Sequence, residues 1–252
     1  GVTDAVSYTL TYFKNGAFEG EITLLTPSGY IVDISDWDDG DTISAVVNAV
    51  DAAGNVSIDS NEVATTIDRS APTVTISVDP TPVPPETRIA EPRPIWEWEG
   101  HDDFSDVDYY LVALDLEPAF RTDETFYEPA SNLPDGPHTL WVKAVDAAGN
   151  ESDDWEESVV LIDTTAPEVP GMPVPEEDPT NDNTPTWSWT GVEDDDFDHY
   201  NVYEDGVKVA EVTEPTYTSE ELADGLHVLE VTSVDDLGNE SARSTQGHVL
   251  ID

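Results

Sequence analysis

The sequence predicts an all-β protein in which sandwich domains follow one another along the chain. Five short motifs recur in register about 90 residues apart, and the residues between them alternate between apolar and polar side chains, as strands with one buried face do. No stretch of the 252 residues shows a sustained helical period. The apolar fraction of 38% and the seven tryptophans indicate folded domains rather than a disordered chain.

The clearest of these motifs is a heptapeptide. AVDAAGN occurs twice, letter for letter, starting at Ala49 and at Ala144, and the related SVDDLGN starts at Ser233, so the spacings are 95 and 89 residues. An Ile-Asp pair, an Asp-Gly pair, the tryptophan-rich WEWEG and WSWTG, and the linkers DRSAP and DTTAP keep the same register. The motifs divide the chain into three repeats, 1–68, 69–164 and 165–252.

Each repeat is expected to consist of short strands. Alternating side chains predict strands over 42–50, 138–145 and 227–234. A hairpin closed by an Asp-Gly turn is predicted over 199–212. About seven short strands per repeat are typical of an immunoglobulin-like sandwich, so we expect tandem sandwiches of this kind in an elongated array.

The first repeat lacks part of this pattern. From Tyr8 onward it has what the other repeats have from Tyr110 or Tyr200 onward, but nothing in it corresponds to the Trp-x-Trp strand or to the strand before it. We therefore expect an unfinished sandwich in this repeat. No signal peptide is visible at the N-terminus, and we expect the chain to be a piece of a longer protein.

The two tryptophan pairs allow two interpretations. Trp96 and Trp98, like Trp187 and Trp189, are two residues apart, so each pair shares one face of its strand. Such a pair forms part of a sandwich core or, less commonly, a platform on which a sugar ring stacks. The sequence favours the core.

The charge is strongly negative throughout. Acidic residues number 56 and basic residues 8, for a formal charge of −48, and the three repeats carry −11, −17 and −20. Such a surface repels nucleic acid and anionic membranes, so we expect neither as a partner, and no apolar run is long enough to insert into a bilayer. Self-repulsion on this scale implies a setting rich in salt or divalent cations.

Acidic residues gather in the loops that a sandwich places at one pole. The B–C and F–G loops lie at the N-terminal pole, and strand G ends at the opposite pole, beside the next repeat. The closing aspartate of one repeat is therefore expected to face both loops of the following repeat. The first cluster comprises Asp68, Asp102, Asp103, Asp106, Asp146 and Asn150, and the second comprises Asp163, Asp194, Asp195, Asp196, Asp235 and Asn239.

Carboxylates that converge in this way favour a bound calcium ion. They repel one another by roughly 1 kcal/mol per pair at 4 Å even in bulk water. Ca²⁺ removes that cost because it accepts oxygen ligands from carboxylates, amides and carbonyls in tolerant geometry, whereas Mg²⁺ demands an octahedron. In the heptapeptide, Asp offers a carboxylate, Gly allows the tight loop and Asn offers an amide oxygen. The same residues also form a good turn without a metal, and this alternative stays open.

The motifs that carry the repeats resemble a known family. AVDAAGNES, DTTAP, NDNTPTWSWTG and LADGLHVLEV are similar to the bacterial immunoglobulin-like repeats of giant repeats-in-toxin (RTX) surface adhesins, including biofilm and ice-binding adhesins. The resemblance covers the second and third repeats and the second half of the first. It implies a secreted protein of the bacterial cell surface, in which neighbouring repeats bind Ca²⁺ at their junctions and stiffen.

The function expected from residues and resemblance together is that of a spacer. The chain has no nucleophile elbow, phosphate-binding loop or zincin motif, and we expect no enzyme activity. Calcium-stiffened repeats would hold the ligand-binding tip of an adhesin away from the cell. The alternative is that this part of the adhesin itself binds a glycan or a protein.

Overall fold

A computed structural model describes residues 4–26, 29–79 and 88–252. The regular elements in this range are all β-strands, as the sequence predicts, and it contains no helix of the length and apolar character needed to cross a membrane. The chain divides into two compact units, one made of residues 1–76, 98–125 and 141–157 and the other of residues 77–97, 126–140 and 158–252. The boundary between the units passes through the second repeat, and the division into three domains stays a prediction.

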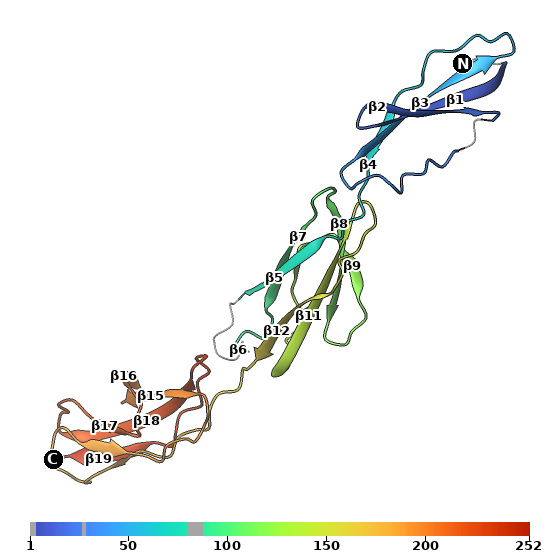
Figure 1. Cartoon of the computed structure of the whole chain (residues 1–252). Helices are drawn as coiled ribbons and strands as arrows, with labels where there is room; N and C mark the ends of the chain where they lie inside the picture. The colour runs from blue at the N-terminus through green and yellow to red at the C-terminus, as the bar shows by residue number, and fades with distance from the viewer. Residues whose placement is uncertain (1–3, 27–28, 80–87) are drawn as a thin grey trace. The chain divides into compact units, whose positions relative to one another are not determined.

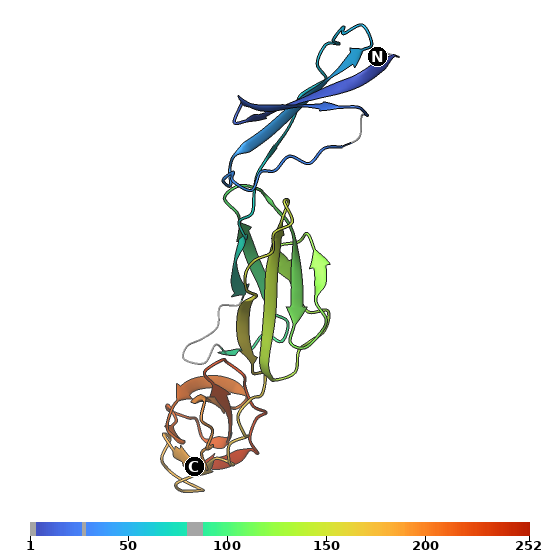
Figure 2. The same ribbon diagram turned by 45° about the vertical axis from the view of Figure 1, so that its right-hand side comes forward.

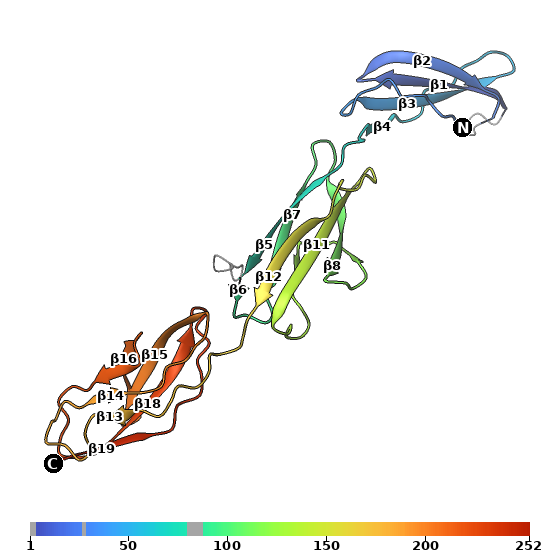
Figure 3. The ribbon, with the colours of Figure 1, turned by 60° about the horizontal axis from the view of Figure 1, so that its bottom comes forward.

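The first repeat contains one antiparallel sheet in the order β2-β1-β3-β4 (Figure 1). Its four strands lie beside one another without a second layer of described strands (Figure 3). Trp37 and Ile67 are the only apolar side chains of its described residues that are buried. The strands are β1 (Ala5–Lys14), β2 (Ala17–Leu24), β3 (Thr42–Asp51) and β4 (Val63–Thr66).

The second repeat contains two sheets, in the orders β10-β7-β5 and β6-β12-β11-β8-β9. A tryptophan of one sheet packs on a tyrosine of the other, since the rings of Trp98 and Tyr110 meet edge to face with their centroids 5.8 Å apart. The strands are β5 (Thr73–Asp79), β6 (Arg88–Ile89), β7 (Ile95–His101), β8 (Val107–Leu114), β9 (Phe120–Thr122), β10 (Phe126–Tyr127), β11 (Gly136–Asp146) and β12 (Glu156–Ile162).

The third repeat repeats this arrangement, with sheets in the orders β13-β14-β17 and β16-β15-β18-β19. Figure 2 shows its strands around a common interior. The predicted hairpin is formed by β15 and β16, and both residues of its Asp205-Gly206 turn have positive φ. The strands are β13 (Val174–Pro175), β14 (Thr186–Ser188), β15 (Phe197–Glu204), β16 (Val207–Val212), β17 (Thr216–Thr218), β18 (Gly225–Asp235) and β19 (Gly247–Ile251).

The tryptophan pairs belong to the cores. Trp96, Trp98, Trp187 and Trp189 are between 0% and 7% exposed, which leaves no ring face free to stack on a sugar. In the third repeat the pair packs with apolar residues of β15, β18 and β19. The described chain is thus all-β, and its second and third repeats are tandem immunoglobulin-like sandwiches, so the prediction of the fold class is confirmed.

Candidate metal centres

The heptapeptide folds into the same loop in all three repeats. The aspartate Oδ1 accepts the backbone N–H of the asparagine four residues later at 2.8 Å, and Oδ2 accepts the asparagine Nδ2 at 2.8 Å. The aspartate N–H in turn donates to the asparagine carbonyl at 3.0–3.2 Å, and the glycine between them has a φ of 86–93°. The three pairs are Asp51 and Asn55, Asp146 and Asn150, and Asp235 and Asn239.

Three carboxylates meet beside the second copy of this loop. Asp68, Asp102 and Asp146 each offer an oxygen, and these three oxygens lie within 4.8 Å of one another. Asp68 closes the first repeat, Asp102 follows β7 and Asp146 ends β11. We call this group the first triad. All three residues belong to the same compact unit.

Hydrogen bonds from the backbone hold the first triad in place. Asp102 Oδ1 accepts the N–H groups of Phe104 and Ser105 at 2.9 and 3.0 Å. Asn150 Nδ2 donates to the backbone carbonyl of Asp68 at 3.4 Å, so the heptapeptide loop reaches the closing aspartate directly. Asp146 is only 2% exposed. The carboxylates are therefore fixed by donors that do not neutralise their charge.

One oxygen of the first triad is buried without a well-formed hydrogen bond among the described residues. Asp68 Oδ2 and the nearby hydroxyl of Ser105 both lack such a bond. Burial opposes the ionisation of Asp68, but hydrogen bonding to Ser105, Ser70 and Asp102 outweighs it and lowers the pKa of this carboxyl. Asp68 Oδ1 accepts the N–H and the hydroxyl of Ser70. A buried carboxylate oxygen without a donor is costly unless a cation takes the place of the donor. The donor set therefore fits a hard cation.

The second triad is built in the same way beside the third copy of the loop. Oxygens of Asp163, Asp196 and Asp235 lie within 4.8 Å of one another, and Asp235 is 2% exposed. Asn239 Nδ2 donates to the backbone carbonyl of Asp163 at 3.0 Å. These residues all belong to the other compact unit. Each triad thus joins the closing aspartate of one repeat to two loops of the next.

An arginine reaches the second triad. Arg88 Nη1 donates to Asp196 Oδ2 at 2.6 Å and lies 3.4 Å from Asp163 Oδ2, while its Nη2 donates to Asp236. The side chain is 13% exposed. Nothing in the repeat pattern of the sequence marks Arg88 as a site residue.

The carboxylates of the second triad also act on one another. Burial raises the pKa of the Asp163 carboxyl, and the charges of Asp196 and Asp235 add to the rise. The hydrogen bond to Asp196 raises the pKa of Asp194 in the same loop. In Asp196, by contrast, burial is outweighed by hydrogen bonds from Asp194 and Arg88, which lower the pKa of its carboxyl. Arg88 therefore compensates part of the negative charge of the second triad.

Six of the twelve predicted site residues lie outside the triads, namely four aspartates and two asparagines. Asp103 is exposed and lies against His101, and Asp195 is exposed. Asp106 contributes its backbone carbonyl, which accepts the N–H of Ala147, and Asp194 contacts Asp196 rather than joining the triad. The amide nitrogens of Asn150 and Asn239 are used as donors, so only their Oδ1 atoms remain for the predicted role as ligands.

The two B–C loops supply their carboxylates from different positions. Asp106 and Asp196 are equivalent, because each accepts the N–H of the residue after the heptapeptide aspartate, at 2.9 Å in both repeats. Yet the first triad uses Asp102, four residues earlier than Asp106. An alignment of the repeats alone does not reveal that the two triads take their B–C loop carboxylate from different positions.

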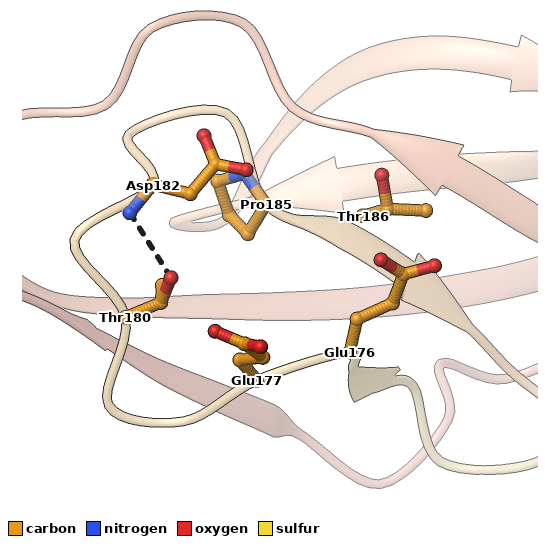
Figure 4. A pocket seen from close by; sticks show the side chains of 6 residues that line it. All are labelled: Glu176, Glu177, Thr180, Asp182, Pro185 and Thr186. Carbon is orange, nitrogen blue, oxygen red and sulfur yellow. Dashed lines mark hydrogen bonds between the residues drawn. The ribbon is translucent and has the colours of Figure 1, made fainter.

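A further acidic hollow lies in the third repeat (Figure 4). Glu176, Glu177 and Asp182 line it together with Thr180, whose hydroxyl accepts the N–H of Asp182 at 3.0 Å. These three carboxylates do not form a group close enough to share one ion, in contrast to the triads. The hollow therefore lacks the carboxylate spacing of the two triads.

No protein-family model matches the sequence, and no curated protein matches it. Solved structures do match. They include a 1.5-MDa bacterial ice-binding adhesin in a study of its retention at the host cell surface, at 16% identity over 98% of this chain and 86% of the other, with a TM-score of 0.47. A Ca²⁺-stabilised adhesin with which an Antarctic bacterium binds ice matches at 20% identity over 98% and 65%, with a TM-score of 0.46. Domains of titin match at 12% identity over 98% and 94%, with a TM-score of 0.49.

Proposed function

We propose that the two triads bind calcium, and that the chain is part of the calcium-stiffened extender of a secreted bacterial surface adhesin. The observation that carries the proposal is the first triad, where three carboxylate oxygens from three separate segments lie within 4.8 Å of one another and the buried Asp68 Oδ2 lacks a well-formed hydrogen bond among the described residues. Folding to this arrangement without a cation requires like charges to be desolvated together.

Calcium suits the triads better than other common cations. Three carboxylates offer up to six oxygens, and the remaining ligands of Ca²⁺ can be water or loop carbonyls. The triads contain no nitrogen or sulfur ligand, which makes zinc and copper poor candidates. When bound, the ion supplies charge neutralisation and a rigid link between the oxygens.

Stiffening follows from which segments the ion would join. Asp68 is the closing residue of the first repeat, whereas Asp102 and Asp146 belong to loops of the second. An ion held by all three fixes the end of one repeat against the next. Without it, the carboxylates repel one another and the junction gains freedom. A chain of such junctions would extend when calcium is present.

The charge of the chain agrees with an extracellular setting. A net charge of −48 on 252 residues destabilises the compact state by self-repulsion unless cations screen it. Calcium is plentiful outside cells, and the resemblance to RTX adhesin repeats supports the same setting. The acidic surface also keeps neighbouring copies apart, which suits a spacer on a crowded cell surface.

The proposal is tested by comparing calcium with screening salt. The melting temperature and the small-angle scattering of the chain are measured in chelator, and then with CaCl₂, with MgCl₂ or with NaCl. We expect calcium to raise the melting temperature and the mean length, and NaCl to restore only part of the stability, because screening cannot supply a central charge to the triads. Full replacement of calcium by NaCl would contradict the proposal, and binding to a glycan array would favour the alternative of a ligand-binding module.

A further inference from the structure

The two triads differ in one respect that the repeats do not explain. The second triad has a guanidinium among its carboxylates, and the first has none among the described residues. We infer that Arg88 is a built-in counter-ion that holds the second triad together without a metal, so that the two junctions respond to calcium at different concentrations. This inference rests on the proposed calcium binding. It adds that calcium fills the two triads one after the other as its concentration rises.

The fold places Arg88 at this position. β6 runs parallel to the end of β12, where Arg88 pairs with Leu161 and Ile89 pairs with Ile162. The N–H of Asp163 then donates to the carbonyl of Ile89 at 3.0 Å, so the closing aspartate lies immediately beyond the arginine. A guanidinium with five donors in one plane suits a set of carboxylates, and it remains charged at every pH at which the protein is folded.

Three acidic residues share the charge of Arg88. It lies against Asp163 and Asp196, which belong to the triad, and against Asp236, which follows the triad residue Asp235. The side chain of Arg88 is 13% exposed and those of Asp163 and Asp196 are 21% and 19% exposed, so solvent screens these two pairs less than it screens surface pairs, whereas the side chain of Asp236 is 43% exposed. A metal that enters this triad meets a positive charge already in place.

The basic residue nearest the first triad in sequence does not pair with the carboxylates of that triad. Arg69 directly follows Asp68, but its guanidinium donates to the carbonyls of Trp37 and Ile34 and lies near Asp39. The described residues of the first repeat also contain no strand parallel to β4 that corresponds to β6. Among the described residues, the first triad therefore has no cationic side chain in the role of Arg88.

The third repeat shows that the arginine is not a general feature of the fold. Thr180 forms a parallel bridge with Ile251, and the N–H of Asp252 donates to the Thr180 carbonyl at 3.1 Å, as Asp163 does to Ile89. This register puts Pro179 in the place of Arg88. Among the described repeat ends, only the second therefore carries a guanidinium at this position. Calcium should fill the first triad at lower concentration than the second.

The test compares Arg88→Gln with a matched loss of charge elsewhere. The control is Arg93→Gln, because Arg93 lies in the same unit and pairs with Glu128 rather than with a triad. Calcium binding to the whole chain is followed by calorimetry, and unfolding is followed in chelator. Asp146→Asn removes a ligand of the first triad, so we expect this variant to lose the tighter of the two calcium sites of the wild-type chain.

We expect Arg88→Gln to tighten the weaker calcium site by about tenfold or more, because a positive charge next to the ion is removed. The same variant should unfold at a lower temperature than Arg93→Gln in chelator, and calcium should close the gap. Unchanged calcium affinities in Arg88→Gln, or a weaker second site, would overturn the inference while leaving calcium binding itself intact. If no variant binds calcium, the proposed function fails, and the inference that Arg88 holds the triad then depends on the unfolding in chelator alone.

Discussion

The first and second repeats carry the heptapeptide AVDAAGN letter for letter and fold it identically, yet its surroundings differ completely. In both copies the aspartate accepts two hydrogen bonds from the asparagine at 2.8 Å. Asp146 is 2% exposed and belongs to a triad, whereas Asp51 is more exposed and belongs to no such group in the described part of the chain. The sheets that carry the loops differ in the same way, because only the second repeat has a second sheet over its core.

This difference separates two roles of one motif. In the first repeat the loop is held by its own hydrogen bonds, and no carboxylate triad of the described residues surrounds it. The first triad forms because Asp68 and Asp102, which belongs to the B–C loop, lie beside the heptapeptide loop of the second repeat. The turn-only interpretation therefore describes the first copy, and the proposed calcium site concerns the other two.

The largest expected effect concerns the uncovered sheet. Amide hydrogen exchange should be faster in β3 than in β11, because β11 lies in a two-sheet core and β3 does not. Fully burying one large apolar side chain contributes about 1.5–3 kcal/mol, so local opening should cost several kcal/mol less in the first repeat. The measurement is exchange followed by mass spectrometry over 4–68 and 72–163 in a monomeric sample. Equal protection in both regions would show that another part of the chain covers the first sheet.

The next effect concerns the two identical loops. Asp146→Asn and Asp51→Asn remove the same loop carboxylate, but only the first removes a triad ligand. Asp146→Asn should abolish about 2–3 kcal/mol of the stabilisation that saturating calcium gives to the first junction, and Asp51→Asn should abolish none of it. The measurement is denaturant unfolding with calcium and with chelator.

A second variant strengthens this comparison. If Asp68 and Asp146 hold one ion, Asp68→Asn alone should lose as much calcium stabilisation as Asp146→Asn, and the double variant should lose little more. Additive losses would assign the two residues to separate environments. A calcium response of Asp51→Asn as weak as that of Asp146→Asn would show that the ion binds the loop itself.

The sequence predicts the class of the fold, and it predicts that Asp68 lies near Asp146 and Asp163 near Asp235, which the structure brings together; their role as calcium ligands stays a prediction. Alternation and the recurrent motifs report which side chains face a core, and the loop positions of a sandwich follow from strand direction. The choice of Asp102 rather than Asp106 depends on the course of one B–C loop, which no periodic pattern encodes. Arg88 was missed because it lies outside every motif and reaches the triad only through the parallel pairing of β6 with β12.

The smallest expected effect isolates one hydrogen bond. Asn150 and Asn55 make the same bonds within their loops, but Asn150 Nδ2 also donates to the Asp68 carbonyl at 3.4 Å. Asn150→Ala should therefore destabilise the chain in chelator by about 0.5 kcal/mol more than Asn55→Ala, because this bond is long and a typical net hydrogen bond contributes about 0.5–1.5 kcal/mol. Denaturant unfolding of both variants measures the difference. Asn239→Ala, whose corresponding bond to Asp163 is 3.0 Å, should show a larger difference. Equal losses in all three variants would mean that the asparagine serves its own loop only and does not link it to the preceding repeat.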